Sequence, residues 1–198
     1  MNLGAIVEGH GETEAVPALI RKVVGWLDPT LSVNVPPPIR LPKGSMLKEG
    51  DLKKAVELTA RKVGPGSPIL IVLDADDDLA CALGPRLLAW ARQARGDREV
   101  GVVVATRAYE AWLLASASTL AGHRGLPLSL EIIERPELIP NPKAWMDARM
   151  PDGYVETLDQ VALTALIDPA LARRTGSFDK LVRDLGRLVG RDVPAVSG

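Results

Sequence analysis

Residues 3–20 read LGAIVEGHGETEAVPALI, and the order of these residues decides the fold that we predict. The apolar run LGAIV ends at Glu8, and a glycine-rich turn separates this carboxylate from an amphipathic helix pattern that begins at Glu12. A buried strand that turns sharply into a helix is the first part of a β-α-β unit. The stretch therefore predicts an α/β fold with a carboxylate at the carboxyl end of its first strand.

Three further apolar runs look like strands of the same sheet. They lie at 31–35 (LSVNV), 68–73 (PILIVL) and 100–105 (VGVVVA), and helical patterns occupy 12–27, 51–63 and 83–95 between the strands. The last two runs are continuous and rich in β-branched residues, which is typical of strands with both faces buried. The alternation predicts a Rossmann-like α/β fold, with a mainly parallel four-stranded sheet flanked by helices.

The sequence changes character after residue 122. An amphipathic pattern at 106–120 follows the fourth strand, prolines then become frequent, and shorter helical patterns follow at 158–167 and 176–189. We expect residues 1–122 to form the α/β core and residues 123–198 a helical extension packed on it. Prolines, glycines and basic residues in the segment PPPIRLPKGSMLKEG (36–50) predict a mobile loop at one edge of the sheet.

Composition limits the function without identifying it. The 198 residues carry a formal net charge of −1, so no overall positive field indicates a protein that coats nucleic acid. Cys81 is the single cysteine, which excludes an internal disulfide and a cysteine-rich zinc site. No apolar run has the length of a membrane span, and the N-terminus lacks a signal-peptide pattern. We expect a cytoplasmic protein without a membrane partner.

A second acidic motif, LDADDD, ends the strand at 68–73 and places Asp74, Asp76 and Asp78 at alternate positions. Active sites of open parallel sheets form beyond the carboxyl ends of the strands, where Glu8 and Glu12 also lie. Carboxylates gathered at one edge repel one another unless a cation lies among them. Mg²⁺ or Mn²⁺, which prefer oxygen ligands, fits that requirement.

The two acidic motifs also allow other interpretations. Taken alone, Glu12 could simply complement the positive end of a helix, and DADDD could be a solvated turn that caps the helix after it. A dinucleotide fingerprint lacks its third glycine, and a P-loop lacks its lysine. A receiver-like phosphoacceptor site fits Glu8, Asp74 and Thr106 loosely, but no fifth strand with a terminal lysine is present.

The pair IVEGHGETE and IVLDADDD resembles the TOPRIM domain, in which a glutamate-glycine step ends the first strand and an Asp-x-Asp motif ends the third. The spacing from Glu8 to Glu12 looks most like the nucleases of the "overcoming lysogenization defect" branch. RAYEAWLLAS, NPKAWM, ETLDQVALTA and SFDKLVR are similar to segments of an uncharacterised bacterial family of small TOPRIM-like proteins. With them, the resemblance covers almost the whole chain.

This resemblance implies that Glu8, Asp74 and Asp76 bind one or two divalent ions, with Glu12 joining them. Two ions about 4 Å apart activate a water and stabilise the leaving oxygen in phosphodiester cleavage. A topoisomerase is not expected, because the tyrosines Tyr109 and Tyr154 have no recognisable nucleophile context. The resemblance also makes a partner ATPase plausible.

Further candidates complete the predicted site. Glu110 and Arg107 follow the fourth strand, where they are suited to complete the metal shell and to hold a phosphate, or else to form a surface ion pair. Ser177 and Lys180 resemble the late serine and lysine of the nuclease branch, although a helix cap and a solvated lysine also explain them. Arg40, Lys43 and Lys48, with Lys53 and Lys54 beyond them, are predicted to contact a nucleic-acid backbone, or to lie in a solvated loop.

The prediction is a metal-dependent TOPRIM-type phosphodiesterase, most simply a nuclease. Two alternatives remain open. One is a regulatory subunit that binds metal or nucleic acid without catalysis. The other is a phosphoryl-transfer enzyme that acts on small molecules.

Overall fold

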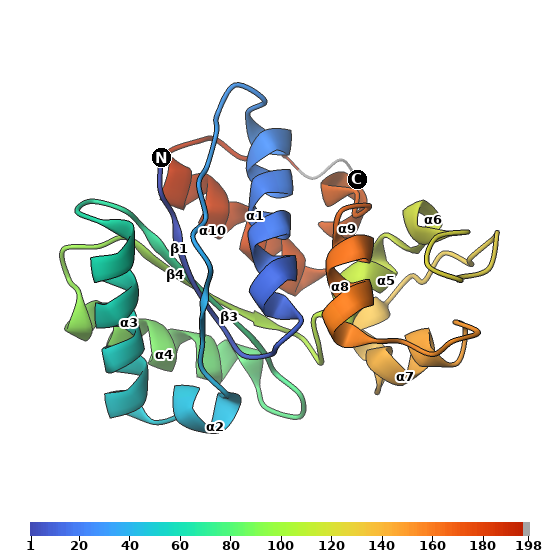
Figure 1. The fold of residues 1–198 in the computed structure, drawn as a ribbon, viewed down its shortest axis with the longest axis horizontal. Coiled ribbons are helices and arrows are strands. Elements are labelled where there is room, and N and C mark those ends of the chain that lie inside the picture. Colours follow the sequence, from blue (N-terminus) through green and yellow to red (C-terminus); the bar gives the residue numbers. More distant parts are fainter. Residues whose placement is uncertain (196–198) are drawn as a thin grey trace.

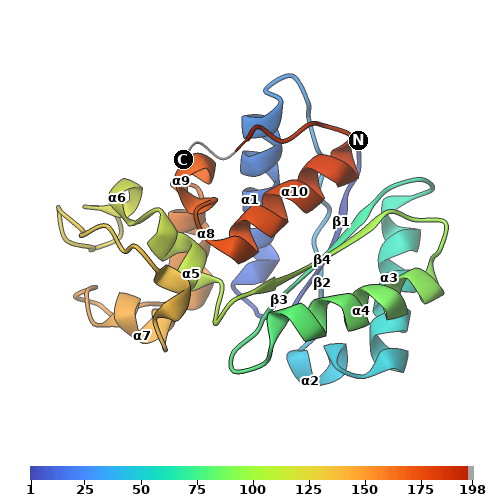
Figure 2. The same ribbon diagram turned by 180° about the vertical axis from the view of Figure 1, so that it is seen from behind.

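The computed structural model describes residues 1–195, which form a four-stranded sheet with helices on both faces (Figures 1 and 2). The strands run parallel in the order β2-β1-β3-β4. Their bounds are β1 (Gly4–Val7), β2 (Ile39–Arg40), β3 (Ile69–Asp74) and β4 (Val100–Ala105). Every residue of β1, β3 and β4 is buried, as expected for parallel strands covered on both sides. The predicted α/β class and the parallel four-stranded sheet are confirmed.

Alternate residues of the strands separate two hydrophobic layers. Val7, Leu70 and Val72 pack with α1 (Glu12–Leu27) and α10 (Gly176–Val189). Ile6 and Ile71 point to the opposite face, toward α3 (Glu49–Val63) and α4 (Ala80–Ala94). This alternation follows from the two-residue period of a strand. None of the helices in the described part of the chain is both long and apolar enough to cross a membrane.

The short helices gather mainly at one end of the molecule (Figure 1). Apart from α2 (Lys43–Met46), they are α5 (Glu110–Ala115), α6 (Ala117–Leu120), the 3₁₀ turn η1 (Pro136–Leu138), α7 (Pro142–Asp147), α8 (Glu156–Thr164) and α9 (Pro169–Ala172). The patterns predicted at 158–167 and 176–189 correspond to α8 and α10. Because α8 packs on α1 and α10 packs on β4, the extension shares the core of the sheet.

The second strand does not lie where the sequence predicts it. The run at 31–35 contributes one bridge, between Asn2 and Asn34, and the strand β2 lies instead within the segment predicted as a loop. Three prolines at 36–38 have no N–H donor, so they interrupt the ladder between the bridge and β2. The loop prediction for 36–50 was therefore wrong in part, since this segment holds both β2 and α2.

The helix predicted at 106–120 begins later and is broken. Arg107 has a φ of 68°, which a right-handed helix cannot include, so α5 starts at Glu110. Ser116 separates α5 from α6, and its hydroxyl accepts a hydrogen bond from the N–H of Asp168 at 2.8 Å. The contact explains the break, because it ties Ser116 to the chain entering α9.

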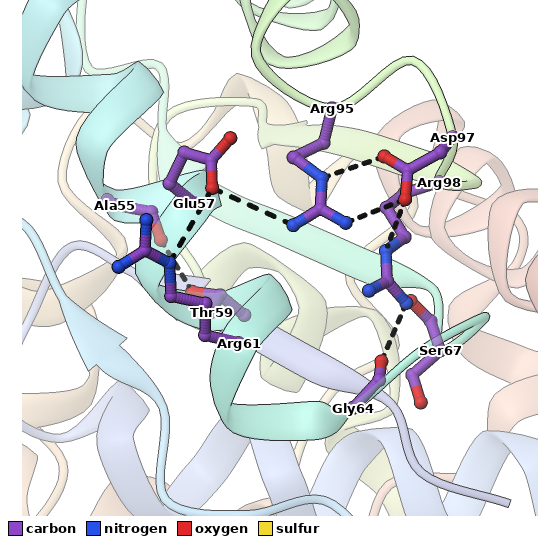
Figure 3. Close-up of polar contacts among 9 residues, drawn as sticks. All are labelled: Ala55, Glu57, Thr59, Arg61, Gly64, Ser67, Arg95, Asp97 and Arg98. Atoms are coloured by element: carbon purple, nitrogen blue, oxygen red, sulfur yellow. Dashed lines mark hydrogen bonds and ion pairs between the residues drawn. The ribbon is translucent and has the colours of Figure 1, made fainter.

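Arginines hold the amino ends of β3 and β4 (Figure 3). The buried Arg98 donates from Nη1 to the carbonyl oxygens of Gly64 at 2.6 Å and Ser67 at 3.4 Å. Arg95 forms an ion pair with Asp97 at 2.6 Å. These contacts fasten the loops that precede the two strands, so this edge of the sheet is fixed independently of the acidic residues at the carboxyl ends.

Candidate functional site

Strand register brings the two acidic motifs together. β1 and β3 are adjacent, and Val7 pairs with Val72, so Glu8 and Asp74 emerge from neighbouring strands at one edge. The N–H of Asp74 donates to Glu8 Oε2 at 3.1 Å. The sequence left open whether these strands were direct neighbours, and the structure shows that they are.

The connection from β1 to α1 approaches α8 closely at two glycines, and at Gly11 the backbone of α8 leaves no room for a side chain. A Cβ on Gly11 would lie 2.6 Å from Gln160 Oε1 and 2.7 Å from the carbonyl oxygen of Glu156. A Cβ on Gly9 would lie 2.9 Å from Glu156 Oε1. Glycine avoids these clashes because it has no Cβ. The two glycines thus allow a helix of the C-terminal extension to reach the carboxylates that follow β1.

Three carboxylates at this edge share one arrangement, in which backbone N–H groups fix one oxygen. Glu8 Oε2 accepts a hydrogen bond from the N–H of Asp74. Glu12 Oε2 accepts hydrogen bonds from the N–H groups of Glu8 and Gly9 at 2.9 and 3.0 Å. Asp74 Oδ1 accepts one from the N–H of Tyr109 at 2.8 Å. Within residues 1–195, the second oxygen of each carboxylate has no hydrogen-bond donor and is not sealed from solvent. Three anchored side chains therefore present free oxygens to a ligand.

Glu110, in the first turn of α5, adds a fourth carboxylate that is completely buried. Its Oε1 accepts hydrogen bonds from the hydroxyl of Tyr154 at 2.9 Å and from Gln160 Nε2 at 3.1 Å. Its Oε2 is buried without a partner among the described residues. A buried polar atom without a hydrogen-bond partner lowers the stability of the fold by about 1–3 kcal/mol, and by more when it is charged. Binding of a proton or a cation at this oxygen would remove that penalty.

The four carboxylates disfavour one another's charge. Burial raises the pKa of Glu12 to about 7, and the charges of Glu8 and Glu110 act in the same direction. Burial likewise raises the pKa of Asp74 well above its usual range, with Glu12 and Glu110 adding to the effect. Burial is also the largest cause of the raised pKa values of Glu8 and Glu110. A cluster of this kind binds protons or a metal ion more readily than isolated carboxylates do.

Lys143, near the start of α7, supplies a positive charge to the cluster. Its Nζ donates to Glu156 Oε2 at 2.9 Å. Burial opposes the charge of this lysine, but the carboxylates of Glu110, Glu156 and Asp74 outweigh burial and raise its pKa. Lys143 lies outside the motifs that predict the site from the sequence.

An open cleft of about 230 Å³ adjoins the cluster, and six of the residues that line it are polar: Asp74, Asp76, Asp77, Arg107, Asn141 and Lys143. The cleft therefore combines carboxylates from the β3 end with two cationic side chains. One cation follows β4, and the other belongs to the C-terminal extension. An anion bound there would meet both cations beside the acidic cluster.

Asp76 and Asp78, both predicted as metal ligands, bind a lysine of α2. Lys43 Nζ lies 2.7 Å from Asp76 Oδ2 and 3.1 Å from Asp78 Oδ2, and it donates to the carbonyl oxygen of Ala75 at 2.7 Å. Both aspartate side chains are more than half exposed, unlike the buried Asp74. Lys43, predicted as a nucleic-acid contact, thus neutralises two residues of the acidic motif.

Two further basic candidates, Arg40 and Lys48, are exposed. Arg40 pairs in register with Val7, so it leaves the sheet beside Glu8, and Lys48 precedes α3. Both side chains lie at the carboxyl edge of the sheet or in the segment that follows it. They are accessible to a large ligand approaching this edge.

Arg107 and Asp76 hold a strained connection beside the cleft. Both residues have positive φ angles, 68° and 51°, and the N–H of Asp76 donates to the carbonyl oxygen of Arg107 at 2.9 Å. Arg107 Nη1 binds Asp77 Oδ1 at 2.6 Å. Non-glycine residues in this conformation cluster at functional sites. The guanidinium of Arg107 thus meets a residue that follows β3.

The structure does not join Lys180 to the acidic cluster. Its Nζ binds Asp184 Oδ2 at 2.7 Å, and it lines a different cavity. Ser177 Oγ accepts a hydrogen bond from Trp112 Nε1 at 2.8 Å and donates to Glu137. Among the hydrogen bonds and ion pairs of the described residues, none links Lys180 or Ser177 to Glu8.

Sequence reasoning missed the polar residues that the extension brings to the site. They are Lys143, Tyr154, Glu156 and Gln160. Only the tertiary fold brings these residues to motifs more than 60 positions earlier in the chain. One signal was present: Glu156 and Gln160 are four residues apart, so they share one face of a helix.

The donor set suits a hard divalent cation, since every candidate ligand atom is a carboxylate oxygen. Glu8, Glu12 and Asp74 have a free oxygen each, and Glu110 has an orphaned one, so the residues fit Mg²⁺ or Mn²⁺. Over residues 1–195, no three or more His, Cys, Asp or Glu side chains lie in an arrangement that could hold a metal ion as it stands.

Comparison with known proteins gives the family. A family model described as a domain of unknown function (DUF4276) matches residues 7–186. The match contains both acidic motifs and the segments that carry Lys143 and Gln160. Searches of curated proteins and of solved structures found no match. Because the family model spans most of the sequence, the chain belongs to the DUF4276 family.

Proposed function

We propose that this protein is a metal-dependent phosphodiesterase that cleaves nucleic acid, with Mg²⁺ or Mn²⁺ as its cofactor. The observation that carries the proposal is the convergence of Glu8, Glu12, Asp74 and Glu110 at the carboxyl edge of the sheet, each with an oxygen that lacks a protein partner. The TOPRIM resemblance of the two acidic motifs points to the same chemistry.

Glu8, Glu12 and Asp74 would hold the cation, and the orphaned oxygen of Glu110 would lie beside them. A bound divalent ion would supply an activated water and stabilise the departing oxygen. The backbone N–H groups that fix Glu12 and Asp74 orient these side chains before any ligand arrives. Such preorganisation favours catalysis.

The chain's own cations would bind the phosphate. Arg107 offers two donors to phosphate oxygens and Lys143 a compact charge, and both border the cleft. Glu8 is half-buried and keeps one carboxylate oxygen free of donors from the described residues, so it is placed to accept a proton from the attacking water. The water oxygen bonds to phosphorus, the bond from phosphorus to one sugar oxygen breaks, and that oxygen takes up a proton.

The size of the cleft favours a polymer over a small molecule. Its volume of about 230 Å³ lies below the roughly 300–1,000 Å³ of pockets that enclose whole ligands. A cleft of this size suits one phosphodiester group of a longer chain. Arg40 and Lys48 would then contact flanking phosphates without reading the base sequence.

The proposal places the enzyme in the cytoplasm with its nucleic-acid substrate. The resemblance to small TOPRIM-like proteins suggests a partner ATPase that delivers the substrate. In that case the isolated chain cleaves slowly and with little selectivity, and the partner raises its rate.

Nicking of supercoiled plasmid in Mg²⁺ or Mn²⁺ tests the proposal. The wild type is compared with Glu8→Gln and Asp74→Asn, and with Glu14→Gln, which neutralises an exposed carboxylate in the same helical turn as Glu12. We expect metal-dependent nicking by the wild type and by Glu14→Gln, and at least about a hundredfold loss in the other two variants.

Two results would contradict the proposal. Equal nicking by all four proteins would identify a contaminating nuclease. Stable, metal-dependent binding of DNA without cleavage, even with a partner ATPase added, would instead support a regulatory subunit.

A further inference from the structure

A second cavity borders the same two strand–helix connections as the acidic cleft. After β3, Asp77 of the connection lines the cleft, and Cys81, in the first turn of α4, lines the second cavity. In the connection after β4, Arg107 lines the cleft and Thr106 the second cavity. Thr106 and Arg107 are consecutive residues, whose Cα atoms lie about 3.8 Å apart, so the cleft and the second cavity flank the same short stretch of backbone.

The walls of this cavity are mostly apolar and carry little side-chain bulk. Pro85 and Val104 contribute apolar surface, and Gly84 and Gly176 contribute backbone alone. The volume of about 320 Å³ is at the lower end of the range for ligand pockets, roughly 300–1,000 Å³. A flat ring system of modest size fits such walls.

Two charged groups border the cavity, and they argue against a phosphate as its occupant. Glu137 accepts hydrogen bonds from the N–H groups of Gly176 at 3.3 Å and Ser177 at 3.0 Å. Its carboxylate already occupies the start of α10 and would repel an anion. The ammonium group of Lys180 forms an ion pair with Asp184, and the lysine side chain is partly exposed. The cavity thus offers Glu137 as an acceptor, Lys180 as a donor and the hydroxyl of Thr106 as either, beside apolar walls.

We infer that this cavity is the nucleobase subsite of the proposed phosphodiesterase. A base between apolar walls finds an acceptor for its amino group in Glu137 and a donor for its ring nitrogen or keto oxygen in Lys180. Its phosphate then reaches the cleft on the other side of Thr106. The inference rests on the proposed function and deepens it, because it names a nucleotide with an unstacked base as the unit bound at the site.

Cys81 provides a direct test, because it is the single cysteine in the sequence, is exposed, and lines the cavity. The rate of its modification by a thiol reagent is measured in EDTA with deoxynucleoside 5′-monophosphates, with deoxyribose 5-phosphate, or with inorganic phosphate. At ten times the dissociation constant, a bound nucleotide leaves about one site in eleven free, so the rate falls about tenfold.

We expect protection by at least one deoxynucleotide and none by the two phosphates that lack a base. Equal protection by deoxyribose 5-phosphate would overturn the inference in favour of a phosphate site. No protection by any nucleotide up to 10 mM would also overturn it. The assay requires neither metal nor cleavage, so its outcome is independent of the plasmid assay.

A matched pair of variants checks that protection arises in this cavity. Gly84 lines the cavity, and a Cβ there would lie 3.7 Å from Val104 Cγ2, an ordinary contact, so Gly84→Leu adds a side chain to the cavity wall and its Cβ meets no backbone among residues 1–195. Ala82→Leu adds the same side chain at an exposed position of the same helix. Nucleotide protection is expected to disappear in Gly84→Leu and to persist in Ala82→Leu. Undiminished protection in a folded Gly84→Leu protein would place the nucleotide elsewhere.

Discussion

Glu12→Gln is expected to stabilise the metal-free protein, although the substitution alters the proposed active site. Glu12 is almost fully buried, and burial raises its pKa from 4.5 to about 7. Its Oε2 accepts two backbone hydrogen bonds, and the amide oxygen of glutamine accepts the same two. The substitution therefore removes the charge and keeps the anchoring contacts.

The magnitude follows from the linkage between protonation and folding. Below pH 4.5 the carboxyl is protonated in both states, and Glu12 contributes no charge penalty. Between pH 4.5 and about 7 the unfolded state releases its proton while the folded state retains it, so the folded wild type loses stability as the pH rises. At about 1.4 kcal/mol per pH unit, the loss reaches about 3 kcal/mol and is constant above pH 7.

Urea unfolding in EDTA, followed by circular dichroism from pH 4.5 to 8.5, measures this difference. Glu12→Gln and wild type should have similar free energies of unfolding at pH 4.5, and the variant should be more stable by about 2–3 kcal/mol at pH 8. Glu14→Gln, an exposed substitution in the same turn, should stay within about 0.5 kcal/mol of wild type. A wild type that is the more stable protein at pH 8 would refute the account of the buried acidic cluster.

Three further substitutions test separate parts of the structure. Gly11→Ala should lower the free energy of unfolding by about 2–4 kcal/mol, since its Cβ would meet the carbonyl oxygen of Glu156 at 2.7 Å. Gly25→Ala, a control with nothing within 4 Å of the added Cβ, should be neutral or slightly stabilising. Arg98→Ala should destabilise by about 2–3 kcal/mol in urea titrations yet leave plasmid nicking per folded molecule unchanged; reduced nicking would show that the two sheet edges are coupled. Lys143→Met should lower nicking at least about tenfold without abolishing Mn²⁺ binding, and normal nicking would exclude it from the phosphate site.

Local patterns in the sequence were sufficient for most of the sheet and its main helices. The bounds of α1 and α10 match their amphipathic patterns, and Gly190 ends α10 in the left-handed conformation. The edge strand was misplaced because Val33 and Val35 are buried without joining a ladder, and three prolines shift the pairing to Ile39 and Arg40. Burial alone therefore did not distinguish a strand from an extended segment.

In the candidate site, only the residues that follow closely on a strand could be predicted from the sequence. Glu8 and Asp74 converge because both follow parallel strands of one sheet, as the alternation of strands and helices indicated; that the two strands are direct neighbours came from the structure. Lys143 and Gln160 come from an extension whose docking depends on the absence of a side chain at Gly11. No short-range pattern encodes that docking, so the structure was needed to bring a lysine and a buried amide to the acidic edge.

Titration of Mn²⁺ into the metal-free protein by calorimetry tests most directly whether the acidic cluster is a metal site. Asp74→Asn keeps the oxygen that accepts from the N–H of Tyr109, and Asp152→Asn removes a carboxylate from an exposed turn as the matched control. We predict saturable Mn²⁺ binding by the wild type and by Asp152→Asn, weakened at least about tenfold in Asp74→Asn. Equal binding by all three proteins, or none by the wild type, would contradict a catalytic metal site at the end of LGAIVEG.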